Sequence, residues 1–588
     1  MNYRRWLLVG YLLVLMAFTT SVLLIPGEKY DTLTTSDSGF FFGIAREINE
    51  NNGMVEKYSL SHAPYGLPVG IVDQGQPLIT VMFYRAISAL NPNIGLMDVV
   101  RYWGPLLFAL SLIPIFLIGR ELGGDLGGCA AAFFGATLTS SIYWMKVGAF
   151  DREPIQLILG AWTIYLTIKL FKAPRSETPK FALLAGLVYG LFGLIWSGAL
   201  FIAPVVVGGL LFVLLVGFFG KLIRKTTDLF GALLFAIRNH LDLLAGVLGM
   251  LAVTTLALWV IAGQSPIIWT GFARSLLGYV GIGVSGEGIS FTRYAGEMAT
   301  PNSWDDIVYR MYGSDAAAIL TLFVFALILL GLLKFCWSRK RWELLVFPWL
   351  IVIAAMVWPG RGQVRFERMW WPFVPILAGV GAAALVSLVR RLSFEQFGEW
   401  LRHFQRPVVI AFSISLVATP FIFNAYTVAE GTTPPTEWHG GLGWRDEGFM
   451  DAFTWLGNTP ENSVVAIQWS YGHLLTGTSR RATVADGTET MGELGKWENV
   501  ASIQPPDYIY YVSDSRGLIY GMDVPARSYQ VNGRRIDVAR FPTMDENEFR
   551  WIIRTYRDNY GCKIDYIVFD ASEYYSARNY YNVTQPAN

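Results

Sequence analysis

Two carboxylates stand one residue apart in the segment Gly-Ala-Phe-Asp-Arg-Glu-Pro, at Asp151 and Glu153. This segment separates an apolar run that ends near Trp144 from another that begins near Ile155. A charge next to hydrocarbon costs about 3 kcal/mol or more unless something binds it. Two carboxylates facing a water-filled cavity can hold a divalent cation, because such ions take oxygen ligands. A short solvated acidic loop is the alternative interpretation of these two residues alone.

Two further acidic residues lie in loops. Asp37 follows the first apolar run, and Glu297 lies in Arg-Tyr-Ala-Gly-Glu-Met. The loop around Glu297 carries several glycines, so we expect it to be mobile and to act as a lid. A solvated loop residue is the alternative for Glu297.

Three other side chains could bind a phosphate. Arg365 lies at the end of an apolar run, and its planar fork matches phosphate oxygens, although snorkelling or pairing with Glu367 would also explain it. His62 is a possible metal or phosphate ligand, with a structural loop histidine as the alternative. Trp196 ends another run and could line the same site, or could belong to an interfacial aromatic belt.

The composition indicates a membrane protein in which these residues are held between apolar helices. The 588 residues are 53% hydrophobic and 15% charged, against roughly a quarter charged in soluble proteins. The net charge of +1 gives no indication of nucleic-acid binding. The three cysteines are scattered, so they predict neither a disulfide framework nor a clustered metal site.

The apolar runs predict about eleven membrane spans, or up to about thirteen with short or interfacial pieces. The first is expected at Trp6–Ile25, retained because no small-residue cleavage pattern follows it. The others are expected near 99–119, 126–146, 155–172, 181–199, 200–220, 241–263, 314–336, 344–358, 370–389 and 408–427.

Basic residues gather in alternate loops. By the positive-inside rule these loops are cytoplasmic, which places the loops 26–97, 147–154 and 264–312 outside the cell membrane. The basic residues are Arg4, Arg5, Lys169, Lys172, Arg175, Lys180, Lys221, Arg224, Lys225, Lys334, Arg339, Lys340, Arg341, Arg390, Arg391, Arg402 and Arg406.

The last part of the chain has the composition of a globular domain. We expect a transmembrane catalytic domain over 1–427 and an extracytoplasmic mixed α/β domain over 428–588. Within the second, the patterns predict strands at Val464–Ile467, Tyr508–Val512 and Asp565–Asp570, and a helix at Asp545–Arg557.

Taken in order, these motifs resemble those of the catalytic subunit of oligosaccharyltransferase in its single-subunit archaeal or bacterial form, which has the membrane fold called GT-C. Asp37 stands where the family's first-loop aspartate stands, and Asp151-Arg152-Glu153 is similar to its second acidic motif. Tyr294-Ala295-Gly296-Glu297 resembles the flexible-loop motif, and Arg365 resembles the arginine that contacts the donor diphosphate. Trp455-Leu456-Gly457-Asn458-Thr459-Pro460 is similar to the entry of the family's soluble domain, and Arg481–Asp486 to the segment after its signature.

The signature itself departs from the family. The family pattern Trp-Trp-Asp-Tyr-Gly, which binds the hydroxyl of an acceptor Ser or Thr, is matched here by Gln468-Trp469-Ser470-Tyr471-Gly472. A neutral Gln and Ser can still hydrogen-bond a hydroxyl, though more weakly than a carboxylate.

The resemblance implies an enzyme that moves an oligosaccharide en bloc from a dolichyl or other polyprenyl (di)phosphate to asparagine in acceptor proteins, with inversion at the sugar carbon. It implies Mn²⁺ or Mg²⁺ held by Asp37, Asp151, Glu153 and Glu297, with Asp37 and Glu297 also contacting the acceptor amide. Arg365, His62 and Trp196 are then expected at the donor phosphate. The acceptor is expected at Gln468, Trp469, Ser470 and Tyr471.

The altered signature leaves a second enzyme hypothesis open. It keeps the fold and the lipid-linked donor but takes a non-sequon asparagine or a hydroxyl as acceptor. A catalytically silent relative or a glycolipid transporter is a third hypothesis. The retained carboxylates argue against a silent relative, and the concentration of polar residues outside the spans argues against a transporter, whose sites lie near the midplane.

Overall fold

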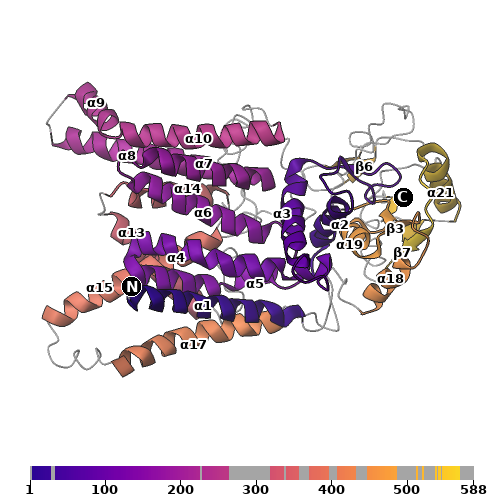
Figure 1. Cartoon of the computed structure of the whole chain (residues 1–588), viewed down its shortest axis with the longest axis horizontal. Helices are drawn as coiled ribbons and strands as arrows, with labels where there is room; N and C mark the ends of the chain where they lie inside the picture. Colours follow the sequence, from indigo (N-terminus) through magenta and orange to yellow (C-terminus); the bar gives the residue numbers. More distant parts are fainter. Residues whose placement is uncertain are drawn as a thin grey trace, which may run out of the picture.

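In the computed structural model of the chain, a helical bundle carries a smaller α/β domain at one end (Figure 1). The structure describes residues 3–27, 33–224, 228–263, 318–336, 340–356, 370–395, 407–431, 447–486, 511–513, 519–521, 537–538, 541–544 and 546–569. Glu297, Arg365 and Asp545 lie outside these ranges.

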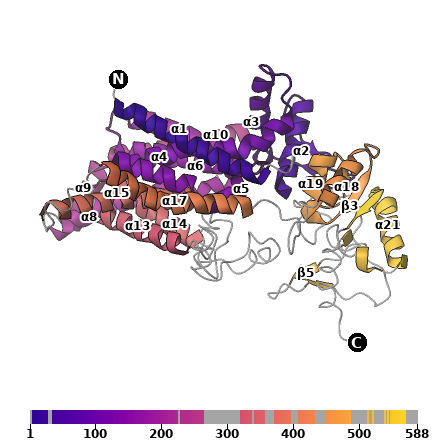
Figure 2. The same ribbon diagram turned by 90° about the horizontal axis from the view of Figure 1, so that it is seen from below.

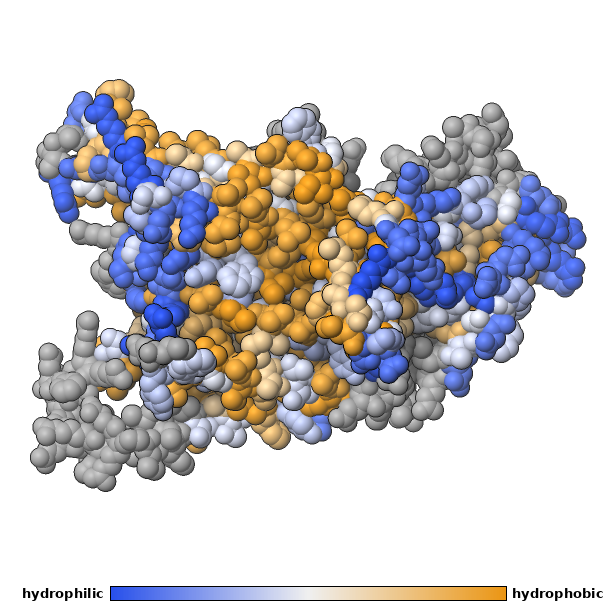
Figure 3. Space-filling view, in the orientation of Figure 1, coloured by the Kyte–Doolittle hydropathy of each residue, from blue (hydrophilic) through white to orange (hydrophobic). Residues whose placement is uncertain are grey.

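Long apolar helices form the bundle, as the composition predicts. Within the described ranges, eight helices are long and apolar enough to cross a membrane, and their side chains form the apolar middle of the molecule in Figure 3. The helices of the bundle and its ends are α1 (Tyr3–Leu24), α4 (Leu96–Ala136), α5 (Thr139–Met145), α6 (Glu153–Lys172), α7 (Thr178–Ile195), α8 (Ile202–Ile223), α9 (Leu229–Asn239), α10 (Leu241–Ala262), α13 (Ala318–Cys336), α14 (Val346–Met356), α15 (Trp370–Glu395) and α17 (Pro407–Gly431), with 3-10 turns η1 (Ile25–Gly27), η2 (Ser197–Phe201) and η6 (Glu343–Leu345).

Helix α4 contains two spans rather than one. Gly124 has φ +74° and ψ −173°, which interrupts the helical backbone. A Cβ on Gly128 would lie 2.8 Å from the carbonyl oxygen of Phe116, although a straight helix would separate these residues by about 18 Å. The chain therefore folds back at Gly124, and the separate spans predicted near 99–119 and 126–146 account for part of the difference between eight helices and eleven.

One end of the bundle is rich in ion pairs. Arg4 lies 2.6 Å from Asp125, and Lys169 and Lys172 both pair with Glu121. This end holds the N-terminus, opposite the end that carries the C-terminal domain (Figure 1).

The segment between the first two spans covers the other end. Helix α2 (Ser36–Glu50) begins at Thr35, whose Oγ1 accepts a hydrogen bond from the backbone N–H of Ser38 at 3.3 Å. Helix α3 (Ile71–Ser88) runs across the bundle axis (Figure 1). A short antiparallel pair, β1 (Lys57–Tyr58) and β2 (Leu67–Pro68), lies between the two helices in the sequence.

The C-terminal domain is built on a parallel sheet with the order β4-β3-β7. Strand β3 occupies the predicted residues, and β7 and α21 fall within or close to the predicted ranges. Figure 2 shows this domain beyond the same end of the bundle as α2. Its elements are α18 (Glu447–Gly457), β3 (Val464–Ile467), α19 (Trp469–Ser479), β4 (Ala482–Thr483), β5 (Tyr511–Ser513), β6 (Ile519–Gly521), η9 (Phe541–Thr543), α21 (Glu546–Tyr560) and β7 (Tyr566–Val568).

Candidate active site between the bundle and the C-terminal domain

The segment that carries the paired acids is tied down by its backbone. The N–H of Val147 donates to the carbonyl of Leu23 at 2.9 Å, and that of Gly148 donates to the carbonyl of Arg101 at 2.8 Å. The carbonyl of Gly148 in turn accepts from the N–H of Thr34 at 2.9 Å. Gly148 has φ +79°, which glycine adopts without steric penalty. Three distant parts of the chain therefore fix the approach to Asp151.

Both acids of this segment are buried. Asp151 is 6% exposed and Glu153 is 1% exposed. One Asp151 oxygen accepts a hydrogen bond from the backbone N–H of Arg152 at 2.7 Å, and Glu153 stands in the first turn of α6, followed by Pro154. The positive end of a helix dipole stabilises carboxylates in this position, which lowers the cost of burying them.

Arg152, between the two acids, is held by residues of helices α2 and α3. Its Nη2 lies 2.8 Å from Asp73 Oδ1, and its guanidinium lies 4.8 Å from the centre of the Phe41 ring. Asp73 is in the first turn of α3 and also accepts from the backbone N–H of Gly70, so its position is fixed.

Asp37 lies on a segment that is hydrogen-bonded to the segment of the paired acids. It is an exposed residue in the first turn of α2. The next residue, Ser38, accepts a hydrogen bond from the backbone N–H of Phe150 at 2.8 Å, and Thr34 Oγ1 donates to the carbonyl of Val147 at 3.1 Å. Three of the four expected carboxylates therefore come from two segments joined by direct hydrogen bonds.

These three carboxylates supply the oxygen donors that Mg²⁺ and Mn²⁺ take. Within the ranges that the structure describes, however, no group of three or more His, Cys, Asp or Glu side chains is close enough to hold a metal ion. The donor chemistry fits such an ion, and the fourth expected ligand, Glu297, lies outside the described residues.

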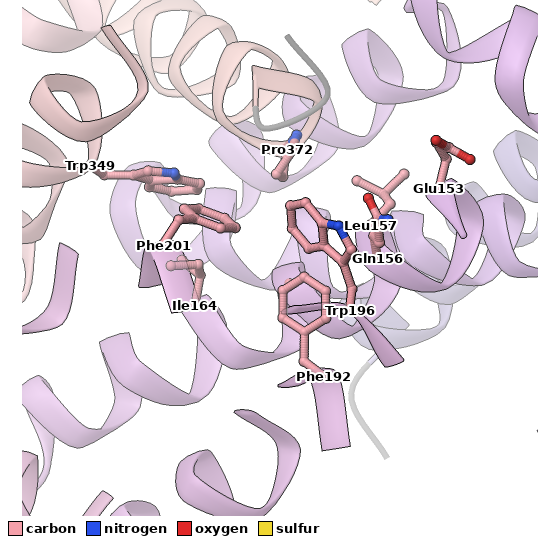
Figure 4. Close-up of a pocket in the computed structure, with 10 residues that line it drawn as sticks. Glu153, Gln156, Leu157, Ile164, Phe192, Trp196, Phe201, Trp349 and Pro372 are labelled. Atoms are coloured by element: carbon pink, nitrogen blue, oxygen red, sulfur yellow. The ribbon is translucent and has the colours of Figure 1, made fainter. Parts of the chain in front are cut away.

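A pocket connects Glu153 with Trp196. In Figure 4 the carboxylate of Glu153 lies at one side of the view and Trp349 at the other. The rings of Trp196 and Phe201 lie between them. The pocket therefore has an acidic end and an apolar body. Its lining residues are Glu153, Gln156, Leu157, Gly160, Ile164, Phe192, Trp196, Phe201, Trp349 and Pro372.

A second, apolar pocket adjoins the first one, because Ile164 and Trp349 line both. It lies among α4, α6, α8 and η6, and Trp342 and Leu122 mark its far side. The two pockets together follow the inside of the bundle away from Glu153.

The expected acceptor residues begin helix α19. Gln468 is half-buried just before the helix, Trp469 and Ser470 are its first residues, and Tyr471 is 2% exposed. Helix α19 packs on α2, the helix that begins beside Asp37. The structure therefore places the start of the altered signature on an element in contact with the Asp37 helix.

The contact between these two helices is a backbone contact. A Cβ on Gly39 would lie 2.1 Å from the carbonyl oxygen of His473, and a Cβ on Gly477 would lie 2.6 Å from the Cα of Gly39. Only glycine fits at either position without moving a helix.

His62, for which the sequence predicts either a metal or phosphate ligand or a structural loop histidine, is buried against the C-terminal domain. It is 2% exposed, and its Nε2 lies 3.3 Å from Asp486 Oδ1 in the C-terminal domain. The sequence did not identify Asp486 or His473 as partners of the first loop. The polar residue types were the only signal in the sequence that could have suggested these contacts.

Known proteins share sequence and fold with this chain. The family model described as "Oligosaccharyl transferase STT3, N-terminal" matches residues 30–366. The chain is 32% identical over 126 residues to a dolichyl-phosphooligosaccharide-protein glycotransferase of Methanococcus voltae, which covers 20% of this chain and 14% of that protein. It is 23% identical over 188 residues to dolichyl-phosphooligosaccharide-protein glycotransferase 1 of Pyrococcus furiosus, covering 32% of this chain and 19% of that protein. The matched segments thus span less than a fifth of these curated relatives.

The fold is shared with a solved archaeal structure. The oligosaccharyltransferase AglB of Archaeoglobus fulgidus, in complex with an inhibitory peptide and a dolichol-phosphate, superposes with a TM-score of 0.60 at 16% identity, covering 94% of this chain and 69% of that one. The same enzyme in its apo form gives a TM-score of 0.62 at 15% identity, covering 98% and 72%. The fold is therefore the expected GT-C type of a multi-pass membrane protein. Because the family match extends over more than half of its length, the chain belongs to the oligosaccharyl transferase STT3 family.

Proposed function

We propose that this protein transfers an oligosaccharide en bloc from a dolichyl or other polyprenyl (di)phosphate to the side-chain amide of asparagine in acceptor proteins. One observation carries the proposal. The turn that holds Asp37 is hydrogen-bonded to the Asp151 segment, and its helix packs on α19, where the altered signature begins. The residues expected to serve donor and acceptor therefore lie on adjoining elements at one end of the bundle. Curated relatives with partial matches are named as glycotransferases of this kind.

The reaction needs help at the acceptor. An asparagine amide is a poor nucleophile because its nitrogen lone pair is delocalised. In the proposed mechanism Asp37 and Glu297 accept hydrogen bonds from the amide protons and hold the nitrogen against the anomeric carbon. The nitrogen then attacks the anomeric carbon in line, with inversion and without a covalent enzyme intermediate. The bond from that carbon to the phosphate oxygen breaks, the polyprenyl (di)phosphate leaves, and one amide proton passes through these carboxylates to solvent.

A divalent cation fits the donor side of the proposed site. Asp37, Asp151, Glu153 and Glu297 would hold Mn²⁺ or Mg²⁺. Such an ion supplies Lewis-acid neutralisation of the leaving (di)phosphate. A related archaeal structure was solved with Zn and sulfate. Arg365 would add electrostatic stabilisation of the developing negative charge.

We assign the pocket between Glu153 and Trp196 to the junction of phosphate and lipid in the donor. Its acidic end contains Glu153, a proposed cation ligand, and its aromatic body and the adjoining pocket present apolar side chains that a polyprenyl chain would contact. We therefore assign Trp196 to the donor site. We further propose that this site lies on the extracytoplasmic side, because the opposite end of the bundle carries the basic residues that are typical of the cytoplasmic side.

The altered signature supports a second candidate, in which the acceptor is a hydroxyl or an asparagine outside the usual sequon. Gln468 and Ser470 replace a tryptophan and an aspartate of the family pattern. Without that carboxylate the hydrogen bond to a Ser or Thr hydroxyl is weaker.

Paired acceptor peptides test the two candidates. The purified protein is incubated with lipid-linked oligosaccharide, Mn²⁺ and peptides that differ only in Asn-x-Thr against Asn-x-Ala. Transfer to the first peptide alone supports asparagine transfer with sequon selection, and equal transfer supports the second candidate. Transfer to neither peptide, nor to any hydroxyl acceptor, would refute both.

A further inference from the structure

A cluster of buried polar side chains joins the first outer loop to the C-terminal domain. Asp486, at 0% exposed, lies at its centre. Ser61 donates a hydrogen bond from Oγ to Asp486 Oδ2, and His62 Nε2 lies 3.3 Å from Asp486 Oδ1. His473 Nδ1, from α19, lies 3.8 Å from Asp486 Oδ2. Ser61 and Asp486 are 425 positions apart in the chain, so this contact exists only in the folded protein.

The carboxylate is held in its charged form. Burial raises the pKa of Asp486, but His473, His62 and the hydrogen bond from Ser61 lower it by more, and the net pKa lies well below the ordinary value. A buried charge is retained only where its partners satisfy it, so loss of the carboxylate leaves Ser61 and the two histidines without their common anionic partner.

The backbone around this cluster leaves little room for adjustment. The carbonyl of Leu60 accepts from the N–H of Thr483, and the N–H of Ala63 donates to the carbonyl of Thr483, each at 2.9 Å. His62 between them has φ +52°, a conformation that L-residues with side chains adopt rarely. A Cβ on Gly472 would lie 2.2 Å from the carbonyl oxygen of Ala485. The loop, the Asp486 segment and α19 therefore pack at backbone distance.

These contacts continue to the site that carries the acids. His473, beside Asp486, packs its ring 4.9 Å from that of Phe40 in α2, and its carbonyl faces Gly39. Ser38 precedes Gly39 in α2, and its Oγ accepts a hydrogen bond from the backbone N–H of Phe150, the residue before Asp151. One continuous series of contacts thus runs from Asp486 through α19 and α2 to the paired acids.

We propose that Asp486 is a positioning residue that, by holding His62 and Ser61 on one side and His473 on the other, fixes the start of α19 relative to Asp37. The proposal rests on the proposed transfer reaction, because it gives the start of α19 the task of holding the acceptor. Asp486 does not touch substrate in this role. It sets the distance between the acceptor-binding segment and the residue that contacts the acceptor amide.

The test compares Asp486→Ala with Asp537→Ala in the full chain. Asp537 is a matched control, since it is also an aspartate at 0% exposed in the C-terminal domain and accepts a hydrogen bond from Tyr556 Oη at 2.9 Å. The first measurement is hydrogen exchange of the backbone amides in residues 469–479, which reports local opening independently of activity. We expect faster exchange there in Asp486→Ala than in Asp537→Ala.

The second measurement separates positioning from general destabilisation. The KM for the acceptor peptide should rise on the order of tenfold to a hundredfold in Asp486→Ala, because misplacement by about 1 Å has effects of that size. The KM for the lipid-linked donor should stay unchanged, and Asp486→Asn, which keeps the shape and an acceptor for Ser61, should recover part of the loss. A purely structural role would lower the active fraction, and hence the apparent kcat, without changing the acceptor KM.

Two results would overturn the proposal. One is equal exchange in residues 469–479 for the two alanine variants. The other applies if the wild type transfers the oligosaccharide: it is a KM for the acceptor peptide in Asp486→Ala equal to that of the wild type. If that variant does not fold, Ser61→Ala removes one hydrogen bond to the same carboxylate and is judged by the same two criteria. A wild type without transfer would refute the reaction itself, and the exchange measurement alone would then decide whether Asp486 holds α19.

Discussion

The contact between α2 and α19 predicts a large kinetic effect from a single methyl group. In Gly39→Ala the new Cβ would meet the carbonyl oxygen of His473 at 2.1 Å, its carbon at 2.5 Å and the Cα of Leu474 at 2.6 Å. All three are backbone atoms, so no side chain can rotate away. Ordinary contact begins at 3.4 Å, and the difference between 3.4 and 2.1 Å requires the helices to separate by about 1.3 Å.

The free energies involved leave the protein folded. Overpacking of this kind costs about 1–3 kcal/mol, and the higher helix propensity of alanine returns about 1 kcal/mol. The remainder is smaller than the roughly 5–15 kcal/mol that stabilises a typical domain. A displacement of this size between Asp37 and the acceptor segment should nevertheless lower kcat/KM for peptide glycosylation by on the order of a hundredfold.

The assay measures initial rates of transfer from lipid-linked oligosaccharide to an Asn-x-Thr peptide, with thermal unfolding followed in parallel. Gly53→Ala is the control, because a Cβ there has nothing within 4 Å, and it should keep wild-type rates. Wild-type kcat/KM in a folded Gly39→Ala protein would refute the inference that α2 and α19 set the geometry of transfer.

Three further predictions follow from the same site. Glu153→Gln should raise the Mn²⁺ concentration required for half-maximal rate and lower kcat by at least on the order of a hundredfold, since it removes one charge from the proposed cation site. Titration with Mn²⁺ after EDTA treatment measures both effects. An unchanged titration curve would show that Glu153 does not bind the cation. Trp196→Ala should raise the KM for the lipid-linked donor but leave that for the peptide unchanged, because Trp196 lines the pocket with Glu153; the reverse pattern in a two-substrate kinetic analysis would contradict the donor assignment. The pKa of Asp486 is lowered on folding, so its contribution to stability is fully present above the unfolded value of about 3.9 and is lost as pH falls through the folded value. Unfolding temperatures between neutral pH and about pH 3 should therefore fall more steeply for wild type than for Asp486→Asn, and parallel curves would show that Asp486 does not contribute.

The apolar helices were predictable because their signal is local. The break inside α4 was found from sequence, since charged residues and glycines interrupt the apolar run, and a span needs about 20 apolar residues. Strand β3 was found because four apolar residues follow turn residues. Strand β4, only Ala482–Thr483, was missed because two residues give no periodicity.

The relationships that assemble the site were not predictable in the same way. Gly39 and Gly477 each look like an ordinary glycine in sequence, and their meaning appears only when two distant helices touch. Asp486 stands in Ala-Asp-Gly, which is typical of an exposed turn. Its complete burial depends on His62 and His473, which come from other elements. Residue types and spacing singled out the acids, and the ordered resemblance to a family gave them expected roles. Neither gave information on these supporting contacts.

The ion pair between Arg152 and Asp73 has a consequence for the balance of charge in the acidic segment. Arg152 stands in the chain between two acids, and its side chain is engaged by a carboxylate from α3 at 2.8 Å. Asp73 therefore keeps the guanidinium of Arg152 paired and away from the two acids. A neutral residue at position 73 would release a permanent cation within reach of Asp151 and Glu153, where it would compete with any dissolved metal for the same oxygens.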